Sequence, residues 1–524
     1  MCRRALRPHI LTNCGPFLTI VKEHQAVRRE SLCMIAVESP LTMPPSTEAR
    51  VPADARDTDR AHAAMPLLTR QWTWLAVMSL VVAGLLSLAV VVGRIPVISR
   101  LIGDPLFFKR CLVVHVDLAL IAWFYTFIAG LTAMRAPLSA NGLARFPLWL
   151  ALTGMALMLA GAAVPGAIPV LSNYIPVIDH PLFFAGLGFF FGGVLCNFVQ
   201  SVLAKPARRA GGLPADSATG LLAAALAVVL AASSWISARA GLPEGLDTWT
   251  RAEFSAWGAG HVLQVANVSA MLAVWLWLLC RATGRQVLTN RQARVLFTLL
   301  LAPHFIMPLL TCRGTMDRLY IDGATMLMRW GIFPVVLTVL FFSFRHLRRH
   351  RAKILEPVQR MAAAGFKASA ALTLLGILLG ACIRSSTTLI PAHYHASLGA
   401  VTAAFMAGAF LVIEAFARDA GRLESLARLW GSARRQVMLF GIGQSVFAIG
   451  FGIGGVYGLG RKAYSSEQHV RSAGELAGVG IMGIGGLVAV AAGLWFLTLV
   501  IRELRRGRAA EAVTPRLLPI RVMP

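Results

Sequence analysis

Two histidines separated by one residue, His393 and His395, open an apolar stretch that continues to about Phe416. Each residue of an α-helix turns the chain by about 100°, so side chains two residues apart point about 200° from each other. The pair is therefore poorly placed to bind one small metal ion, but each imidazole could bind a separate flat cofactor. The simpler alternative is that both lie at a membrane surface and hydrogen-bond to lipid headgroups or loops.

The composition indicates a membrane protein. Of the 524 residues, 57% are hydrophobic and only 14% are charged, and the mean hydropathy is +0.67, which excludes an ordinary soluble globular protein. The net charge of +26 would suggest nucleic acid as the partner of a soluble chain. Here the basic residues fall mostly in short segments between apolar stretches, so we expect a lipid bilayer and no nucleic acid as the partner.

The cysteines give no sign of a site. Eight of them are scattered along the chain without a CxxC pair. This pattern signals neither a zinc site, nor a disulfide framework, nor a covalently attached cofactor.

Twelve apolar stretches, each about as long as the roughly 20 residues that a bilayer requires, follow one another along the chain. They predict an all-α membrane protein, a bundle of twelve transmembrane helices. The expected spans are Trp72–Val92, Leu112–Met134, Phe146–Leu171, Pro181–Leu203, Thr219–Ala238, Phe254–Cys280, Val295–Cys312, Ile321–Phe344, Ala368–Ile390, Ala392–Phe416, Val437–Leu459 and Gly478–Val500.

The ends of the chain differ from this membrane domain, which we place at residues 71–505. Residues 1–70 are polar and contain neither a membrane span nor a convincing signal peptide, so we expect a disordered tail or a start codon placed too early. Residues 506–524 are expected to form a cytoplasmic C-terminal tail.

The basic residues also predict the orientation. With the N-terminus inside, the cytoplasmic connections between spans hold 21 Lys and Arg residues and the opposite connections hold 11. This bias favours a multi-pass protein with both termini in the cytoplasm.

Five histidines lie within these spans or at their edges. His115 lies in the second span, His261 in the sixth and His304 in the seventh, while His393 and His395 begin the tenth. In the predicted orientation all five fall in the outer half of the membrane. Ionisable residues inside a membrane are costly, so a common depth favours one shared site over five independent core positions.

The ligand count suggests haem chemistry. A six-coordinate haem needs two axial imidazoles from facing helices, and a reactive haem keeps one and leaves a position open. His115 and His395 could form the first pair, and His393 could bind a second haem on the other side of its helix. His261 and His304 remain, and imidazoles at such a place suit copper or non-haem iron.

This arrangement resembles subunit I of the haem-copper oxidase superfamily, which includes cytochrome oxidases, quinol oxidases and nitric oxide reductases. The resemblance covers about residues 70–505 and rests on the order and spacing of three stretches. These are His115-Val-Asp-Leu-Ala-Leu, Trp257-Gly-Ala-Gly-His261 and His393-Tyr-His395.

The resemblance implies the role of each residue. His115 and His395 would bind the low-spin haem, His393 the high-spin haem, and His261 and His304 the copper or iron beside it. A basic pair, Arg461 and Lys462, would face the haem propionates, which suits charge-assisted pairing with carboxylates. The alternative for this pair is an ordinary position at the membrane interface with the charged heads in water.

The chain also departs from the family's pattern. The seventh span has His304 where two adjacent histidines are usual, so one metal ligand is missing. Val265 occupies one position of the redox-active tyrosine of oxidases, and the seventh span contains no tyrosine. The glutamate that nitric oxide reductases carry near the histidine of the sixth span is absent, and Gln264 and Asn267 are the polar neighbours of His261.

As a function, the resemblance implies a respiratory terminal oxidoreductase, similar to cytochrome c oxidase subunit I, in the inner membrane of a bacterium. Two haems of b or related type, with copper or non-haem iron, would reduce dioxygen. Electrons would come from a cytochrome c or cupredoxin, through a small subunit II. A nitric oxide reductase-like enzyme, a non-catalytic haem-binding gas sensor or assembly protein, and a transporter with incidental histidines are the alternatives.

Overall fold

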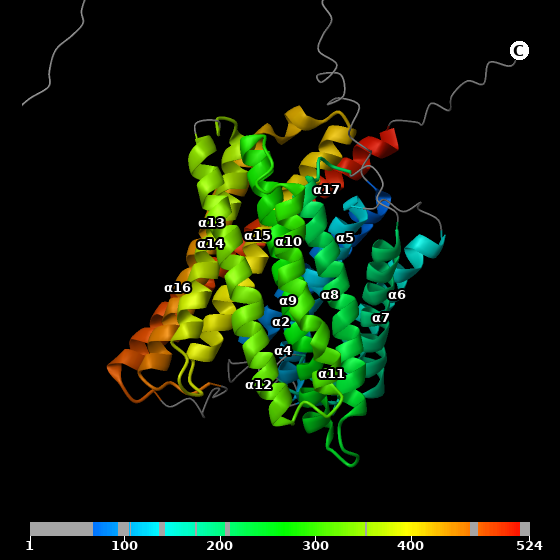
Figure 1. Ribbon diagram of the computed structural model, residues 1–524, viewed down its shortest axis with the longest axis vertical. Helices are drawn as coiled ribbons and strands as arrows, with labels where there is room; N and C mark the ends of the chain where they lie inside the picture. Colours follow the sequence, from blue (N-terminus) through cyan, green and yellow to red (C-terminus); the bar gives the residue numbers. More distant parts are fainter. Residues whose placement is uncertain are drawn as a thin grey trace, which may run out of the picture. The chain divides into compact units, whose positions relative to one another are not determined.

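The computed structural model describes residues 66–92, 104, 106–135, 142–172, 175–204, 210–351, 354–461 and 470–513. Within these ranges, twelve helical segments are long and apolar enough to cross a membrane. The predicted twelve-helix membrane bundle is confirmed (Figure 1).

Nine of the twelve spans are formed by one α-helix each. These are α2 (Leu67–Val92), α6 (Gly142–Ala163), α7 (Pro181–Leu203), α8 (Ala215–Ala240), α9 (Thr248–Thr283), α14 (Pro357–Ala381), α15 (Leu389–Asp419), α16 (Ala427–Val456), which follows the short 3₁₀ turn Leu423–Leu426, and α17 (Ala473–Val513).

The second, seventh and eighth spans change their helix type part of the way across. The second span consists of α4 (Phe107–Val116), the π-helical turn Asp117–Ala122 and α5 (Trp123–Arg135). The seventh consists of α10 (Asn290–Leu301), the 3₁₀ turn Ala302–Ile306 and α11 (Met307–Thr311). The eighth consists of α12 (Arg318–Met326), the π-helical turn Leu327–Ile332 and α13 (Phe333–His350). Such turns are frequent at functional sites.

Most predicted spans differ from the structure by several residues at one end or both, among them the eleventh, where α16 begins at Ala427 instead of Val437, and the twelfth, where α17 continues to Val513 instead of Val500. The third was expected to continue to Leu171, but α6 ends at Ala163 and the chain forms a short antiparallel hairpin of β1 (Ile168–Val170) and β2 (Val177–Asp179). The early end of α6 is explained by Pro165 and Pro169, because proline lacks the amide donor that a helix needs. Gly166, at a φ of 77°, allows a left-handed turn between them. The ninth was expected at Ala368–Ile390, whereas α14 begins at Pro357 and ends at Ala381.

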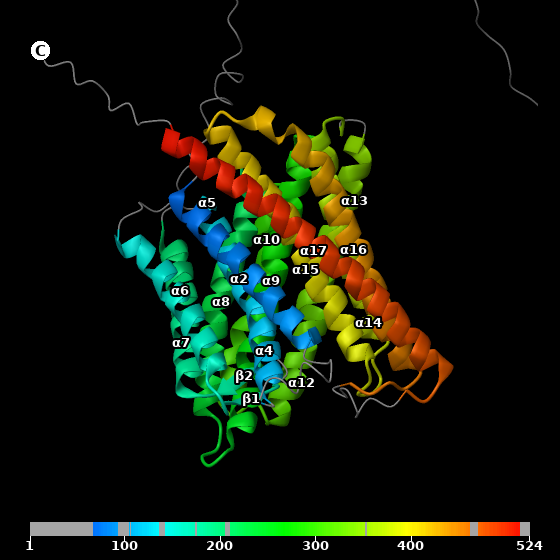
Figure 2. The ribbon, with the colours of Figure 1, turned by 180° about the vertical axis from the view of Figure 1, so that it is seen from behind.

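Helices α9 and α15 form the centre of the bundle. In each, 83% of the apolar span is buried, against 33% in α2 and in α17. The ribbon shows α9 and α15 between their neighbours, with α6 and α7 at one side and α17 along one face (Figures 1 and 2). Three of the five candidate histidines, His261, His393 and His395, therefore lie on the two most enclosed helices.

Close helix pairs depend on glycine. A Cβ atom at Gly450 of α16 would lie 2.3 Å from the backbone nitrogen of Met482 on α17, and one at Gly154 of α6 would lie 2.3 Å from that of Phe190 on α7. Small residues let membrane helices approach backbone to backbone, where van der Waals packing holds them together.

We expect Gly450→Ala to lower the free energy of unfolding by about 1–3 kcal/mol, because the added methyl group overpacks the contact between α16 and α17. Gly480→Ala on α17 is the matched control, since a Cβ there meets nothing within 4 Å, and it should stabilise the helix by about 0.4–1 kcal/mol. Thermal unfolding of both variants in lipid nanodiscs measures the difference, and equal effects would contradict this packing.

Candidate functional site

His393 points from α15 toward α14. Its Nδ1 lies 2.7 Å from the backbone oxygen of Gly376, and its ring fills the space over Gly380, where a Cβ would come within 2.7 Å of the same nitrogen. Because the carbonyl can only accept, Nδ1 carries the proton and Nε2 keeps its lone pair. The ring is therefore held in one orientation with one nitrogen available as a ligand.

His395 points to the other side of α15, toward α16. Its ring is stacked on Phe451, with centroids 5.2 Å apart and an interplanar angle of 5°, and meets the edge of Phe447 at 4.9 Å. The Gln444 side chain donates to the backbone oxygen of His395 over 2.9 Å. The two histidines of the pair thus face different helices, as their helical spacing predicts.

His115 lies in the last turn of α4, just before the π-helical turn of the second span. Its Nδ1 lies 2.8 Å from the backbone oxygen of Ala83 on α2, which again leaves Nε2 with the lone pair. Ten residues after His395 along α15, Phe405 packs against Trp123 and Phe124 on α5, the continuation of the span that carries His115. Two residues on, Asp117 is fully buried, and neither carboxylate oxygen has a hydrogen-bond partner within the described residues.

Arg110 fixes the beginning of α4. Its side chain is 1% exposed and donates to the backbone oxygens of Ala162 over 2.8 Å and Ala167 over 3.3 Å. It also pairs with Asp104, whose carboxylate accepts a bond from the amide of Leu106. A buried guanidinium with these partners ties α4 to the end of α6, and so sets the position of the helix that carries His115.

His261 of α9 is held by a tyrosine from another span. The Tyr320 hydroxyl at the start of α12 donates to the backbone oxygen of Trp257 over 2.6 Å, and its oxygen lies 2.8 Å from Nδ1 of His261. Because the hydroxyl proton is used on Trp257, the histidine donates through Nδ1 and keeps the lone pair on Nε2. One turn before Trp257, the buried Glu253 accepts from the indole of Trp257 over 2.9 Å.

His304 lies in the 3₁₀ turn of the seventh span. Pro303 and Pro308 have no amide proton, which favours this break between α10 and α11. Nδ1 of His304 lies 3.0 Å from the backbone oxygen of Leu300, and the ring packs over Gly331 in the π-helical turn of the eighth span. Its Nε2 is buried without a partner within the described residues, which is costly unless a ligand takes it.

His261 and His304 lie near enough to each other to interact electrostatically. In the part of the chain that the structure describes, however, no group of three or more His, Cys, Asp or Glu side chains is placed to hold a metal ion. The expected pair of imidazoles is present without a third protein ligand of these types. The residues therefore do not fit a copper site with three histidines, in agreement with the single histidine of the seventh span.

The surroundings of His115, His393 and His395 fit histidines that would ligate haem. A ligating histidine usually donates its second ring nitrogen to a carbonyl or another fixed acceptor, which sets the tautomer and the direction of the lone pair. His115 and His393 are held in this way by the backbone of a neighbouring helix. His395 is enclosed by aromatic rings that would pack against a flat macrocycle.

The predicted basic pair is described only in part. Gly460, next to Arg461, forms a bridge with Thr387, and Leu459 accepts from the amide of Thr388 over 3.0 Å. Arg461 therefore follows the point where this loop meets the segment leading into α15. Lys462 lies outside the described residues.

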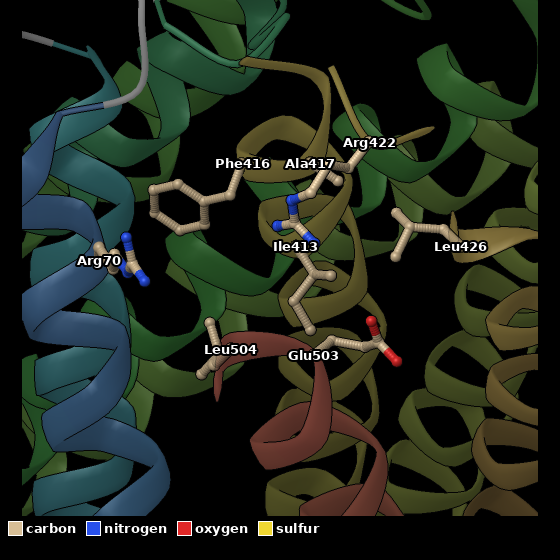
Figure 3. Close-up of a pocket in the computed structure, with 8 residues that line it drawn as sticks. All are labelled: Arg70, Ile413, Phe416, Ala417, Arg422, Leu426, Glu503 and Leu504. Atoms are coloured by element: carbon tan, nitrogen blue, oxygen red, sulfur yellow. The ribbon is translucent and has the colours of Figure 1, made fainter. Parts of the chain in front are cut away.

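A small pocket lies apart from the histidines. It is lined by residues of α2, α15 and α17 and of the connection after α15, among them Arg70, Phe416, Arg422 and Glu503 (Figure 3). None of the five candidate histidines lines it, so this pocket is not the candidate site.

Tyr320 and Glu253 are not among the residues predicted from the sequence. Tyr320 lies next to the predicted start of the eighth span and meets His261 only through folding, and Glu253 lies just before the predicted sixth span. The spacing of four between Glu253, Trp257 and His261 could have indicated that these side chains share one face of a helix.

We expect Tyr320→Phe to lower the free energy of unfolding by about 1–3 kcal/mol, because it leaves the Trp257 oxygen and the His261 Nδ1–H without their partner in a buried place. Tyr457→Phe is the matched control, since Tyr457 is 59% exposed. Unfolding in nanodiscs compares the two, and a loss no larger than that of the control would show that the tyrosine does not hold His261.

Asp104 should make stability depend on pH. The hydrogen bond from Arg110 holds the pKa of the Asp104 carboxyl below its ordinary value of 3.8. Since the pKa is lower in the folded state, the stabilisation is present above pH 3.8 and is lost as the pH falls through the folded-state pKa. Asp104→Asn should therefore be less stable than the wild type at pH 7, with the difference shrinking below pH 3.8. Asp179→Asn, which removes an exposed carboxylate of β2, is the control.

No protein-family model matches the chain. It is 28% identical over 366 residues to an uncharacterized protein of Aquifex aeolicus (strain VF5), covering 68% of this chain and 86% of that protein. It is 25% identical over 492 residues to an uncharacterized protein of Rickettsia prowazekii (strain Madrid E), covering 82% and 94%. Among solved structures, a chain of a heme-copper terminal oxidase dimer, studied by cryo-electron microscopy, superposes with a TM-score of 0.54 at 15% identity, over 86% of this chain and 84% of that one. The twelve-helix bundle described above therefore has the fold of that oxidase chain.

Proposed function

We propose that this chain is the haem-binding subunit of a respiratory terminal oxidoreductase, with dioxygen as the electron acceptor. The observation that carries the proposal is the way in which hydrogen bonds orient the histidine rings. His115, His261, His304 and His393 each have Nδ1 against an oxygen of the protein, which leaves Nε2 as a ligand. The fold shared with a heme-copper terminal oxidase chain supports it.

In this proposal His115 and His395 bind the low-spin haem from neighbouring helices, and His393 binds the high-spin haem on the opposite side of α15. When bound, the haems supply one-electron transfer and an open iron position for a gas. The protein's part is to fix the imidazoles. Gly380 leaves room for the His393 ring, and the Gly376 oxygen sets its tautomer.

His261 and His304 would hold the metal that acts together with the second haem. Tyr320 keeps the proton of His261 on Nδ1, and the π-helical turn at Gly331 makes room for the His304 ring. These two imidazoles could hold a copper or iron ion only with a further ligand, such as water. Tyr320 and Glu253 are the nearby groups able to hold a proton, and both are buried.

The wider setting is also proposed. The chain would lie in the inner membrane of a bacterium with both termini in the cytoplasm, as the basic residues indicate. It would receive electrons from a cytochrome c or a cupredoxin, with a small subunit II between them. The haem-binding domain would comprise about residues 71–505, but the expected boundaries with segments 1–70 and 506–524 are shifted, because α2 begins at Leu67 and α17 continues to Val513. Arg461 and Lys462 would pair with haem propionates.

The two-histidine metal position favours a second candidate. A haem protein that has lost the metal would act as a gas sensor or an assembly protein, without turnover. The lack of a third His, Cys, Asp or Glu ligand within the described residues is the observation in its favour. An enzyme of the nitric oxide reductase type is a further alternative, in which nitric oxide replaces dioxygen at the same place.

The test is an absorption spectrum of the purified protein, reduced and with carbon monoxide, together with metal counting. We expect two haems per chain, one of which binds carbon monoxide. His393→Ala should abolish carbon monoxide binding and keep the low-spin signal, whereas His115→Ala should remove the low-spin signal. His180→Ala, a change at the N-terminal end of α7, is the control and should alter neither.

Several outcomes decide between the candidates. Haem without copper or non-haem iron, and without consumption of dioxygen or nitric oxide, would support the non-catalytic candidate. Consumption of nitric oxide but not of dioxygen would support the enzyme of the nitric oxide reductase type. Colourless protein free of haem would refute the whole assignment and favour a transporter.

A further inference from the structure

A basic pocket opens between α10 and α13, at the end of the bundle predicted to be cytoplasmic. The pocket offers about 560 Å³ of space, part of it open to the surroundings. It is lined by Gln292 of α10, by Val287 just before that helix, and by five residues of α13: Phe342, Arg345, His346, Arg349 and His350. None of the five candidate histidines lines it.

The charges of the pocket are all of one sign. Arg345 and Arg349 are exposed and stand one helical turn apart, so their guanidinium groups share a face of α13 and repel each other. Within the described residues, neither arginine forms an ion pair with a carboxylate. Two positive side chains in this position are stabilised by an anion that both can reach, and guanidinium groups match the oxygens of a phosphate.

The floor of the pocket is ordered. His346 is 9% exposed, and its Nε2 lies 2.8 Å from the hydroxyl oxygen of Thr283 on α9. The His350 ring packs against His346 with centroids 4.7 Å apart. The arginines therefore project from a helix face whose position is fixed by a buried polar contact, rather than from a loosely held end.

The surroundings of the pocket are apolar on the side toward the membrane. Phe342 lies one turn deeper than His346, and Phe341, Leu337 on α13 and Leu299 on α10 are 62%, 46% and 55% exposed. A ligand with a phosphate at one end and hydrocarbon at the other matches this sequence of surfaces. Basic pockets between membrane helices on the cytoplasmic side are suited to such headgroups.

The geometry points to a binding site for a phosphate group, supplied by an anionic phospholipid of the cytoplasmic leaflet. Arg345 and Arg349 hold the phosphate, and the exposed apolar surface beside Phe342 takes the acyl chains. Free phosphate shares the recognised group and is the other source. The exposed apolar residues favour the lipid, because inorganic phosphate would make no use of them.

The experiment uses the full chain in nanodiscs of phosphatidylcholine with a small fraction of phosphatidylglycerol. Native mass spectrometry counts the phosphatidylglycerol molecules that stay bound to the chain after it is released from the nanodisc. The test variant is Arg345→Gln with Arg349→Gln. The matched control is Arg434→Gln with Arg435→Gln, an exposed basic pair on α16 at the same predicted side. A second arm adds inorganic phosphate to protein in a zwitterionic detergent and measures the unfolding temperature.

We expect the wild type and the control to retain bound phosphatidylglycerol. The test variant should retain at least about tenfold less phosphatidylglycerol per chain. Equal loss in both variants would overturn the site, because it would reflect general attraction of basic residues to an anionic surface. No loss in either variant would overturn it as well. If inorganic phosphate raises the unfolding temperature of the wild type but not of the test variant, while lipid retention is equal in both, the anion site stands and the lipid as its source is wrong.

Discussion

A neutral imidazole carries one N–H and one lone pair, and the hydrocarbon around a membrane protein offers a partner to neither. In this bundle the N–H of four candidate histidines is directed to an oxygen of the protein, and three of those oxygens belong to the backbone of Ala83, Gly376 and Leu300. Satisfying the N–H first determines which nitrogen is left over and where it points. The glycines at 331 and 380 follow from the same need, because each leaves room for a ring that is held against a neighbouring element.

The features that depend on local chemistry could be predicted from the sequence. Each span needs about 20 apolar residues to cross a bilayer, and whether a stretch fulfils this requirement depends only on its own residues. All twelve spans were found for this reason. The divergence of His393 and His395 is equally local, since the helix turns by a fixed angle per residue. Their contacts with α14 and α16 could not be named, because they depend on which helices become neighbours.

What the sequence did not indicate depends on contacts between distant segments. Tyr320 and His261 are 59 residues apart along the chain, and no periodicity joins them. The resemblance places a tyrosine in the sixth or seventh span, whereas the phenol beside His261 belongs to the eighth. The end of the third span was missed for another reason. Hydropathy continues through Pro165, Gly166 and Pro169 although these residues cannot continue a helix.

Tyr320 also bears on the part of the site that looked incomplete. A second histidine in the seventh span would have supplied a ligand, and its absence leaves two imidazoles. A phenol that accepts from Nδ1 of His261, and donates its own proton to Trp257, does not replace that ligand, because its oxygen is engaged by the ring on the side away from Nε2. It makes the existing imidazole more rigid. His261 and His304 thus both have Nδ1 bound to an oxygen of the protein, which is the orientation that the proposed metal position would need.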